Sequence, residues 1–364
     1  MATESGEKVT GRVYLDWNAT APLRAEARAA VVAALDAIGN PSSVHAEGRA
    51  AKAVIERARE DVAALVGCRA AEVVFTSGAT EAAGVLAGAV AGRNVFVEET
   101  AHDCLVAHRR MDGDAASGHT LAMGLANGET GVIATPPEKA ADGYAYGARR
   151  ADWLFLDVAQ AVGRVPWAFS WSGADFAILS AHKIGGPKGA GALILREGID
   201  IAPLRPGGGQ ERGRRSGTEN AAAIAGFGAA ARAALADLDT GVWQEVAALR
   251  DRLEDLIRDG APDTVIVGAE GPRLPNTSCL MTPGWKGETQ VMQMDLAGYA
   301  ISAGSACSSG KVRASRVLQA MGYDDMAAAS AIRVSIGPTT READIEGFAV
   351  AWLAQQAKFR ARAA

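Results

Sequence analysis

Two apolar segments of this chain each end in polar side chains that could perform chemistry together. Trp153–Leu156 leads into Asp157, and Phe176–Leu179 leads into the sequence Ser180-Ala181-His182-Lys183. A lysine amine forms a Schiff base with a carbonyl compound when its position is fixed. The sequence Gly185-Gly186-Pro187 predicts a tight turn that would hold this lysine close to the sheet, rather than leave it as a solvated surface residue.

These residue types are the ones that pyridoxal phosphate (PLP) requires. In such a site Lys183 would form the Schiff base, and Asp157 would keep the pyridinium nitrogen protonated so that the ring accepts electrons. Ser180 and His182 could bind the phosphate. Gln160 lies just past the same strand as Asp157, where open α/β sheets bind ligands. The alternative for Asp157 is a helix cap or a turn residue.

Four further segments are candidates for binding. The small residues of Ser77-Gly78-Ala79-Thr80-Glu81 could admit a phosphate at a helix N-terminus, or form an ordinary helix cap. His102 could stack on a planar ring and carry protons, or cap a helix. The glycine-rich, basic segment Arg205–Thr218 could reach an anionic site, including one in a partner subunit, or form a solvated loop. Arg333 interrupts an apolar strand, so it needs an anionic partner, either a substrate carboxylate or a structural acid.

The four cysteines are too widely spaced to predict a disulfide framework or a structural zinc site, and we expect no metal. Cys307 lies among glycines, serines and alanines, which predicts an exposed, reactive thiol in a mobile loop. Cys68 and Cys279 are expected to be structural. Cys104 is interpreted in the same way, although it follows His102 closely.

Composition limits the classes of protein to consider. The chain has 364 residues, of which 49% are hydrophobic, enough for a large core and two domains. A net charge of −5 argues against nucleic acid as the main partner. The chain lacks an apolar run of the roughly 20 residues that span a membrane, and its start lacks the pattern of a signal peptide. We therefore expect a cytoplasmic protein that does not bind membranes.

Short apolar runs alternate with alanine-rich amphipathic segments over the first two thirds of the chain. This alternation predicts an α/β domain with a mostly parallel sheet flanked by helices. Strands are expected at 72–75, 95–97, 121–125, 154–157, 176–179 and 192–195, and helices at 24–38, 46–66 and from about 217. The remainder has fewer strands and predicts a smaller α+β domain. We place the large domain at 16–235 and the small domain at 1–15 and 236–364.

Seven motifs give the chain a family resemblance. They are Tyr14–Pro22, Gly39–Ser43, Phe75–Glu81, the Lys183 block, Arg215–Thr218, Gly304–Cys307 and Ile332–Gly337. With them the chain resembles the cysteine desulfurases of the NifS/IscS type, in the class V aminotransferase group of fold-type I PLP enzymes. The resemblance covers nearly the whole sequence. It implies the fold-type I architecture, a homodimer, and a catalytic cysteine loop at about 303–313 in the small domain.

The resemblance implies a role for each matching residue. Lys183 would form the Schiff base and then move protons, His102 would stack on the ring, and Cys307 would attack the substrate sulfur. The implied ring contacts are Asp157 with the nitrogen and Gln160 with the hydroxyl. The implied phosphate contacts are Ala79, Thr80, Ser180, His182 and, from the other subunit, Thr218. Arg333, helped by Asn40, would bind the substrate carboxylate.

The implied reaction converts L-cysteine to L-alanine and leaves the sulfur on Cys307 as a persulfide. An acceptor such as an iron–sulfur scaffold protein would then receive it. One alternative is a selenocysteine lyase or another class V lyase, against which the presence of Cys307 argues. Another is a non-catalytic paralogue that acts as a scaffold, which would not need Lys183 together with Asp157.

The sequence departs from the family pattern in two places. Members usually have Asn-Asn-Glu-x-Gly-Val, with the second asparagine near the ring hydroxyl, whereas Gly128 stands at that position here. Either Gln160 makes this contact alone or Asn127 shifts toward it. The stretch from His102 to Asn127 is also shorter than usual, so we expect one βα unit to be missing or abbreviated.

Overall fold

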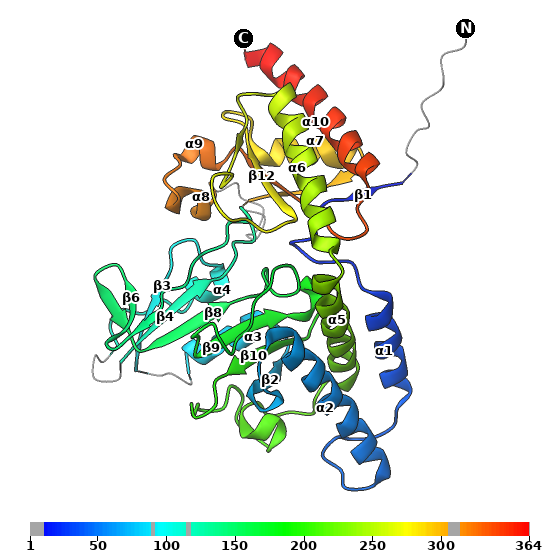
Figure 1. Cartoon of the computed structure of the whole chain (residues 1–364), viewed down its shortest axis with the longest axis vertical. Helices are drawn as coiled ribbons and strands as arrows, with labels where there is room; N and C mark the ends of the chain where they lie inside the picture. Colours follow the sequence, from blue (N-terminus) through cyan, green and yellow to red (C-terminus); the bar gives the residue numbers. More distant parts are fainter. Residues whose placement is uncertain (1–10, 89–91, 114–117, 305–313, 364) are drawn as a thin grey trace. The chain divides into compact units, whose positions relative to one another are not determined.

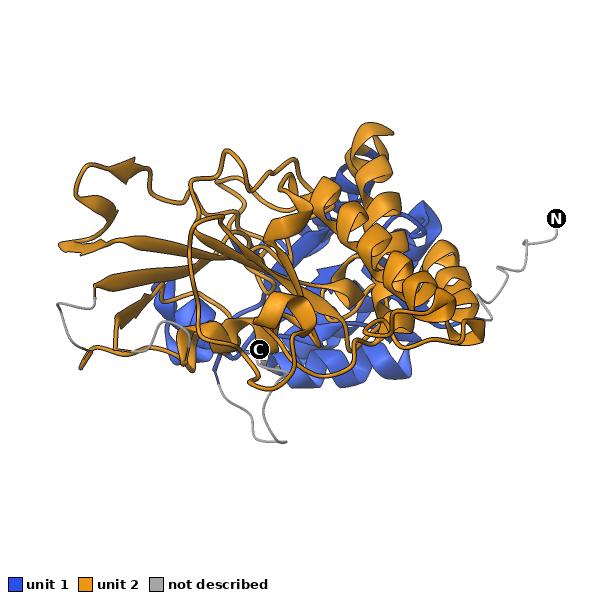
Figure 2. Cartoon of the chain, turned by 90° about the horizontal axis from the view of Figure 1, so that it is seen from below, with its two compact units in different colours: residues 1–17, 245–267, 276–364 blue, residues 18–244, 268–275 orange. Residues whose placement is uncertain are grey.

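The computed structural model describes residues 11–88, 92–113, 118–304 and 314–363. The chain divides into two compact units, which Figure 2 shows in different colours. The large unit contains residues 18–244 and 268–275, and the small unit contains 1–17, 245–267 and 276–364. The large unit extends beyond the predicted boundary at 235 because helix α5 (Ala221–Asp239) continues past it. Residues 268–275 join the large unit through a backbone bridge between Val132 and Arg273.

A six-stranded sheet forms the centre of the large unit, with the strand order β2-β10-β9-β8-β4-β3. Strand β10 runs antiparallel to both of its neighbours, and the other adjacent pairs are parallel. The prediction of a mostly parallel sheet is therefore confirmed. The strands are β2 (Val73–Thr76), β3 (Asn94–Val97), β4 (His119–Gly124), β8 (Trp153–Asp157), β9 (Phe176–Ser180) and β10 (Gly191–Leu195).

Alternate side chains of each central strand enter two different cores, because successive residues of a strand point to opposite faces. Leu154 and Leu156 of β8 pack in the core that includes residues of α1 (Ala25–Asp36), α2 (Ala46–Val66) and α5. Phe155, between them, packs in the core that includes residues of α3 (Ala79–Ala83) and η2 (Gly84–Leu86). Burial on both faces explains why these strands are continuous apolar runs in the sequence.

Three helices of the large unit pack together beside the sheet (Figure 1). They are α1 (Ala25–Asp36), α2 (Ala46–Val66) and α5, and α2 ends at Gly67 in the left-handed conformation, with φ 62°. A Cβ at Gly228 of α5 would lie only 2.6 Å from Cα of Ala58, so glycine allows α2 and α5 to approach closely. By length and composition α5 could span a membrane, but half of it is buried, as in the core helix of a compact unit.

The crossover between the parallel strands β3 and β4 is short. Among its described residues, the one helix is the single turn α4 (Asp103–Val106). The chain then returns along β3, where Val95 and Arg110 exchange two backbone hydrogen bonds with N···O distances of 2.8 and 3.1 Å. The described part of this crossover therefore has the abbreviated form that the short stretch between His102 and Asn127 predicts.

Among the residues that the structure describes, the remaining short elements of the large unit are an antiparallel ribbon and four 3₁₀ turns. In the ribbon, β6 pairs with both β5 and β7. The bounds are β5 (Lys139–Ala140), β6 (Gly143–Tyr146), β7 (Arg149–Ala151), η1 (Ala70–Glu72), η2, η4 (Ala181–Lys183) and η5 (Gln210–Gly213).

The small unit contains an antiparallel sheet in the order β11-β12-β15-β14 and a two-stranded parallel pair, β1 with β13. Trp285 stacks against Phe359 of α10 at a centroid distance of 5.6 Å, and tilts against Trp352 at 5.3 Å. The strands are β1 (Val13–Tyr14), β11 (Val265–Ile266), β12 (Thr277–Met281), β13 (Tyr299–Ala300), β14 (Ser302–Ala303) and β15 (Ala331–Ser335). The helices are α6 (Val242–Gly260), which begins in the large unit, α7 (Gly287–Leu296), α8 (Arg316–Ala320), α9 (Asp325–Ala328) and α10 (Glu342–Ala363).

A buried ion pair holds the glycine-rich segment Arg205–Thr218 against the sheet. The guanidinium of Arg59 donates to both carboxylate oxygens of Glu211 at 2.7 and 2.9 Å, and the backbone N–H of Phe75 donates to the same carboxylate at 2.8 Å. Glu211 and Arg212 both have positive φ angles, 48° and 56°, which side chains other than glycine rarely adopt. The segment is thus not simply a solvated loop, because its centre is fixed to β2.

We expect Glu211→Gln to lower the free energy of unfolding by about 3 kcal/mol, because it leaves the buried charge of Arg59 with Glu56, whose side chain is 42% exposed, as its remaining ion pair. The exposed pair between Arg232 and Asp61 provides the control, since the Arg232 side chain is 62% exposed. Arg232→Met should cost less than about 1 kcal/mol. Urea unfolding followed by circular dichroism measures both, and equal losses in the two variants would contradict this account of the segment.

Candidate active site

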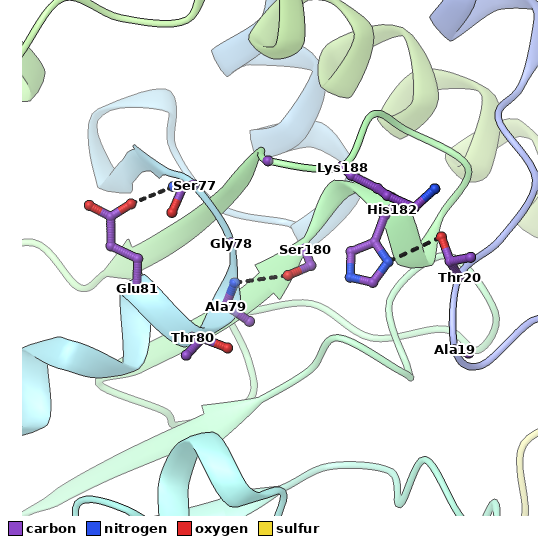
Figure 3. A pocket seen from close by; sticks show the side chains of 11 residues that line it. Ala19, Thr20, Ser77, Gly78, Ala79, Thr80, Glu81, Ser180, His182 and Lys188 are labelled. Atoms are coloured by element: carbon purple, nitrogen blue, oxygen red, sulfur yellow. Dashed lines mark hydrogen bonds between the residues drawn. The ribbon is translucent and has the colours of Figure 1, made fainter. Parts of the chain in front are cut away.

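A pocket of about 450 Å³ lies at the carboxyl end of β9 in the large unit (Figure 3). It is polar at one end because the loop before α3 and the turn after β9 both contribute hydroxyl, imidazole and backbone groups. Its lining consists of Ala19, Thr20, Ser77, Gly78, Ala79, Thr80, Glu81, Ser180, His182, Lys188 and Gly189. Of the phosphate contacts predicted for this chain's own pocket, all four are in this lining: Ala79, Thr80, Ser180 and His182.

The loop before α3 is fixed by short hydrogen bonds. The backbone N–H of Ala79 donates to the hydroxyl of Ser180 at 2.8 Å, and the N–H of Ser77 donates to the carboxylate of Glu81 at 2.6 Å (Figure 3). A Cβ at Gly191 would lie 2.5 Å from Cα of Gly78, so β10 needs glycine where this loop crosses it. Since α3 has only five residues, the anion-binding capacity of the pocket depends mainly on individual donors and less on a helix dipole than the sequence suggested.

His182 is a neutral donor or acceptor at physiological pH. One ring nitrogen, Nδ1, lies 3.2 Å from the hydroxyl of Thr20 (Figure 3). Burial lowers the pKa of His182 to about 4, and the positive charges of Lys183, Lys188 and Arg164 act in the same direction. The ring can therefore exchange hydrogen bonds without carrying charge, and Lys188 is the cationic side chain in the pocket lining.

The amino group of Lys183 lies at the end of β9, in the 3₁₀ turn η4. It donates to the backbone oxygens of Asn18 at 2.5 Å and of Ala19 at 3.1 Å. The glycine-rich turn that follows fits tightly, because Gly185 has φ 83° and a Cβ there would lie 2.6 Å from the Arg24 side chain. The predicted tight turn thus fixes the backbone of Lys183, while its side chain is held by two carbonyl groups.

Asp157, His102 and Cys104 lie together near the ends of β8 and β4. Their possible ligand atoms are all within 4.8 Å of one another, and Cys104 Sγ lies 3.9 Å from Asp157 Oδ2. Burial raises the pKa of Asp157, while the N–H of Ala159 and the charges of His102 and Lys183 oppose that shift. Burial beside this carboxylate also raises the pKa of the Cys104 thiol strongly, so this cysteine is a neutral neighbour of Asp157 and not a nucleophile.

His102 has the helix-capping geometry that was one of its two interpretations. Its Nδ1 accepts a hydrogen bond from the backbone N–H of Cys104 at 3.1 Å, at the start of α4. The ring is exposed. Capping does not exclude the stacking role, because it fixes one edge of the ring and leaves its faces accessible to a planar ligand.

The side chain of Gln160 is held by two neighbours. Its Oε1 accepts a hydrogen bond from Arg164 at 2.8 Å, and its Nε2 donates to the backbone oxygen of Asn18 at 3.0 Å. A Cβ at Gly128 would lie 2.9 Å from this Nε2, so the glycine leaves room for Gln160. Sequence reasoning missed Arg164 and Asn18, although a charged residue in the apolar run after Gln160 was a usable signal.

Asn127 is unable to substitute for the missing asparagine in this conformation. Its Oδ1 accepts hydrogen bonds from the backbone N–H groups of Glu129 and Thr130, each at 2.9 Å. Its Nδ2 donates to the backbone oxygen of Thr100 at 2.9 Å. The hydroxyl of Thr130 also donates to Oδ1, at 3.2 Å. Because both ends of the amide are engaged, the alternative in which Asn127 shifts toward Gln160 would break four hydrogen bonds. The structure thus favours Gln160 for this contact.

Two other predicted site residues, Asn40 and Thr218, are exposed residues of the large unit outside the pocket lining. Asn40 is exposed in the α1–α2 connection, where its side chain accepts from Ser42 N at 2.9 Å. Thr218 is exposed and does not line the pocket. Arg333 belongs to the small unit and donates to Asp16 at 2.5 Å, so it has the structural acid that was one of its two predicted partners. Cys307, with most of the predicted loop 303–313, lies outside the described residues.

Comparison with known proteins identifies the class to which this fold and site belong. The sequence matches the family Aminotransferase class-V over residues 13–113 and 119–348. The chain belongs to this family.

Individual relatives show which kinds of class V protein this chain is similar to. A cysteine desulfurase of Cereibacter sphaeroides is 40% identical, over 92% of this chain and 93% of its own length. An IscS-like cysteine desulfurase of Mycobacterium tuberculosis is 34% identical, over 92% of this chain and 93% of its own length. Among solved structures, a NifS-like protein from Rickettsia africae superposes with a TM-score of 0.81 at 28% identity, covering 94% of this chain and 98% of that one. The fold-type I assignment is thereby confirmed.

We expect His182 to stay neutral in the protein without cofactor until the pH falls to about 4. Because its pKa is lowered in the folded state, His182 supplies stability that is complete above its ordinary value of about 6.5 and is lost progressively as the pH falls toward 4. The ring resonances of this histidine, assigned with His182→Gln, give the titration by NMR. A midpoint above 6 for His182 would contradict the role of burial.

Proposed function

We propose that this chain is a PLP-dependent cysteine desulfurase that converts L-cysteine to L-alanine and transfers the sulfur to Cys307. One observation carries the proposal. A lysine at one strand end, a carboxylate at the end of the neighbouring strand and a set of polar groups suited to a phosphate occur in one unit of a class V aminotransferase. The relatives named cysteine desulfurase, at 34–40% identity over 92% of the chain, support this choice among class V reactions.

The residues of the large unit fit PLP. Ser180, His182 and Thr80 would supply neutral donors for the phosphate, and Lys188 is a cation in the same pocket lining. Asp157 follows β8 and Lys183 follows β9, the strand next to it. These two groups would hold the pyridine nitrogen and the carbonyl carbon of the cofactor. A protonated pyridine nitrogen beside Asp157 would also favour the ionised carboxylate, against the effect of burial.

The bound cofactor would supply an electron sink that makes the bonds at the substrate Cα and Cβ labile. The chain's own groups would orient and move protons. Lys183 would carry a proton to and from the substrate, and His102 would lie over the ring. Gln160 would donate to the ring hydroxyl. We infer from the family resemblance that Arg333 and Asn40 bind the substrate carboxylate, and that Thr218 of the partner subunit completes the phosphate site in a homodimer.

The sulfur transfer balances without an external oxidant. The C–S bond of cysteine breaks, an S–S bond to Cys307 forms, and the substrate carbon gains a hydrogen to give alanine. The sulfur is oxidised to the persulfide level while the carbon is reduced. The Cys307 persulfide would then be passed to a thiol acceptor, and we propose a protein acceptor of the iron–sulfur scaffold type in the cytoplasm.

We expect the purified protein to bind PLP with a yellow absorbance and to release alanine from L-cysteine. Lys183→Ala should lose alanine formation by at least about a thousandfold, because the positioned amine both binds the cofactor and transfers protons. Cys307→Ala should retain the yellow absorbance but lose the persulfide, which alkylation and mass spectrometry detect. Cys68→Ala is the control variant, because burial raises the pKa of the Cys68 thiol to about 12.

Two results would contradict parts of this proposal. A colourless protein that forms no alanine in the presence of added PLP would reject the function as a whole. Undiminished persulfide in Cys307→Ala would reject the role of that cysteine and keep the PLP assignment. An assay with selenocysteine as a second substrate distinguishes a selenocysteine lyase, which would strongly prefer selenocysteine to cysteine.

A further inference from the structure

A buried arginine, Arg164, joins three parts of the candidate active site. Its side chain lies in the crossover between β8 and β9 and is 4% exposed. One guanidinium nitrogen donates to Asn18 Oδ1 at 2.7 Å and to Gln160 Oε1 at 2.8 Å. The other donates to the backbone oxygen of Lys183 at 3.1 Å. A rigid, planar donor can hold several acceptors in a fixed mutual geometry, which a lysine cannot do.

The bond from Arg164 decides which end of the Gln160 amide faces outward. An amide has an acceptor oxygen and a donor nitrogen, and their placement is set by the hydrogen bonds around them. Because a guanidinium can only donate, it selects Oε1 as its partner and directs Nε2 to the opposite side. The backbone oxygen of Asn18 accepts one of the two Nε2 hydrogens at 3.0 Å. The second Nε2 hydrogen takes part in neither of these bonds, so it can serve a ligand acceptor beside Gln160.

The same arginine supports the segment on which the lysine rests. Asn18 is 1% exposed, and its side chain donates to the backbone oxygen of Gly128 at 3.0 Å while accepting from Arg164. The backbone oxygen of Asn18 receives both Gln160 Nε2 and Lys183 Nζ. Loss of the guanidinium would therefore loosen the amide, the lysine backbone and the carbonyl group that holds the lysine amine.

Gly128 makes Gln160 more important in this chain. The position where relatives are expected to carry an asparagine has no side chain, and a Cβ there would come within 2.9 Å of Gln160 Nε2. The Gln160 amide is thus the side-chain donor that this region presents, and its orientation cannot be rescued by a neighbour at 128.

We propose that Arg164 is a positioning residue that orients Gln160 toward the ring oxygen of PLP and fixes Lys183 beside it. The proposal rests on the proposed function, because it takes PLP as the ligand of this pocket. It predicts that Arg164 affects how the cofactor binds and absorbs, and not only how stable the protein is.

The test compares cofactor-free variants of the full chain by titration with PLP. Arg164→Met should weaken PLP binding roughly tenfold, the effect of one charge-assisted hydrogen bond, and should shift the absorbance maximum of bound PLP and its pH midpoint. Arg164→Lys should fall between Met and wild type, because it keeps the charge and loses the fork. Thermal unfolding midpoints are recorded for each variant.

Arg196→Met is the matched control. Arg196 also bridges backbone oxygens, donating to Ala174 at 2.7 Å and to Phe169 at 3.0 Å, but it contacts none of the site residues. It should lose stability with PLP affinity and absorbance unchanged. If Arg164→Met behaved like Arg196→Met, with lower stability and the same affinity and spectrum, the positioning role would be overturned.

Gly128→Ala provides a second variant should Arg164→Met not fold. Its new methyl group crowds Gln160 Nε2 from the other side, so we expect weaker PLP binding and a shifted absorbance maximum here too. Wild-type affinity and spectrum in Gly128→Ala would overturn the role of the Gln160 orientation. Wild-type protein that binds no PLP would overturn this proposal together with the function, whereas normal binding with no effect in either variant would overturn this proposal alone.

Discussion

The parallel pairing of β8 with β9 determines where the chemistry of this molecule can occur. The two strands pair with Asp157 opposite Ile178, so the segments that follow both strands leave the sheet at the same edge. Parallel neighbours also require a crossover long enough to return the chain to the other end of the sheet. That crossover carries Gln160 and Arg164. A β9 strand of the opposite direction would have placed Lys183 at the far edge, away from every one of these groups.

The same edge is made rigid by groups that are distant in the sequence. Asn18 precedes Gln160 by 142 residues, yet its backbone oxygen accepts hydrogen bonds from Gln160 and Lys183. The loop before α3 is fixed to Ser180 in a similar way. The site is thus held mainly by hydrogen bonds between separate segments, while the two hydrophobic cores hold the strands that carry them.

Much of the fold could be predicted because it depends on local patterns. Helix α2 begins and ends where the apolar periodicity and Gly67 indicated, and the buried strands are continuous apolar runs. The residues predicted to contact a phosphate follow strand ends, and for that reason the fold brings them into one pocket lining. The Arg164 network could not, because a charge in an apolar run does not reveal which acceptors the fold will bring to it. The capping bond of His102 and the ion pair of Arg333 with Asp16 were each one of two alternatives, and only the arrangement of the chain decides what is adjacent.

The short return of the chain from β3 has a consequence for how molecules of this protein meet one another. Strand β3 is the last strand of its sheet, and the open side of such a strand is a template for pairing with another polypeptide. Here Val95 already exchanges its outward backbone hydrogen bonds with Arg110, and Arg109 donates to the backbone oxygen of Val97 at 3.1 Å. The abbreviated crossover therefore covers part of the open edge of β3, with the backbone of Arg110 and the side chain of Arg109 in place of an additional strand.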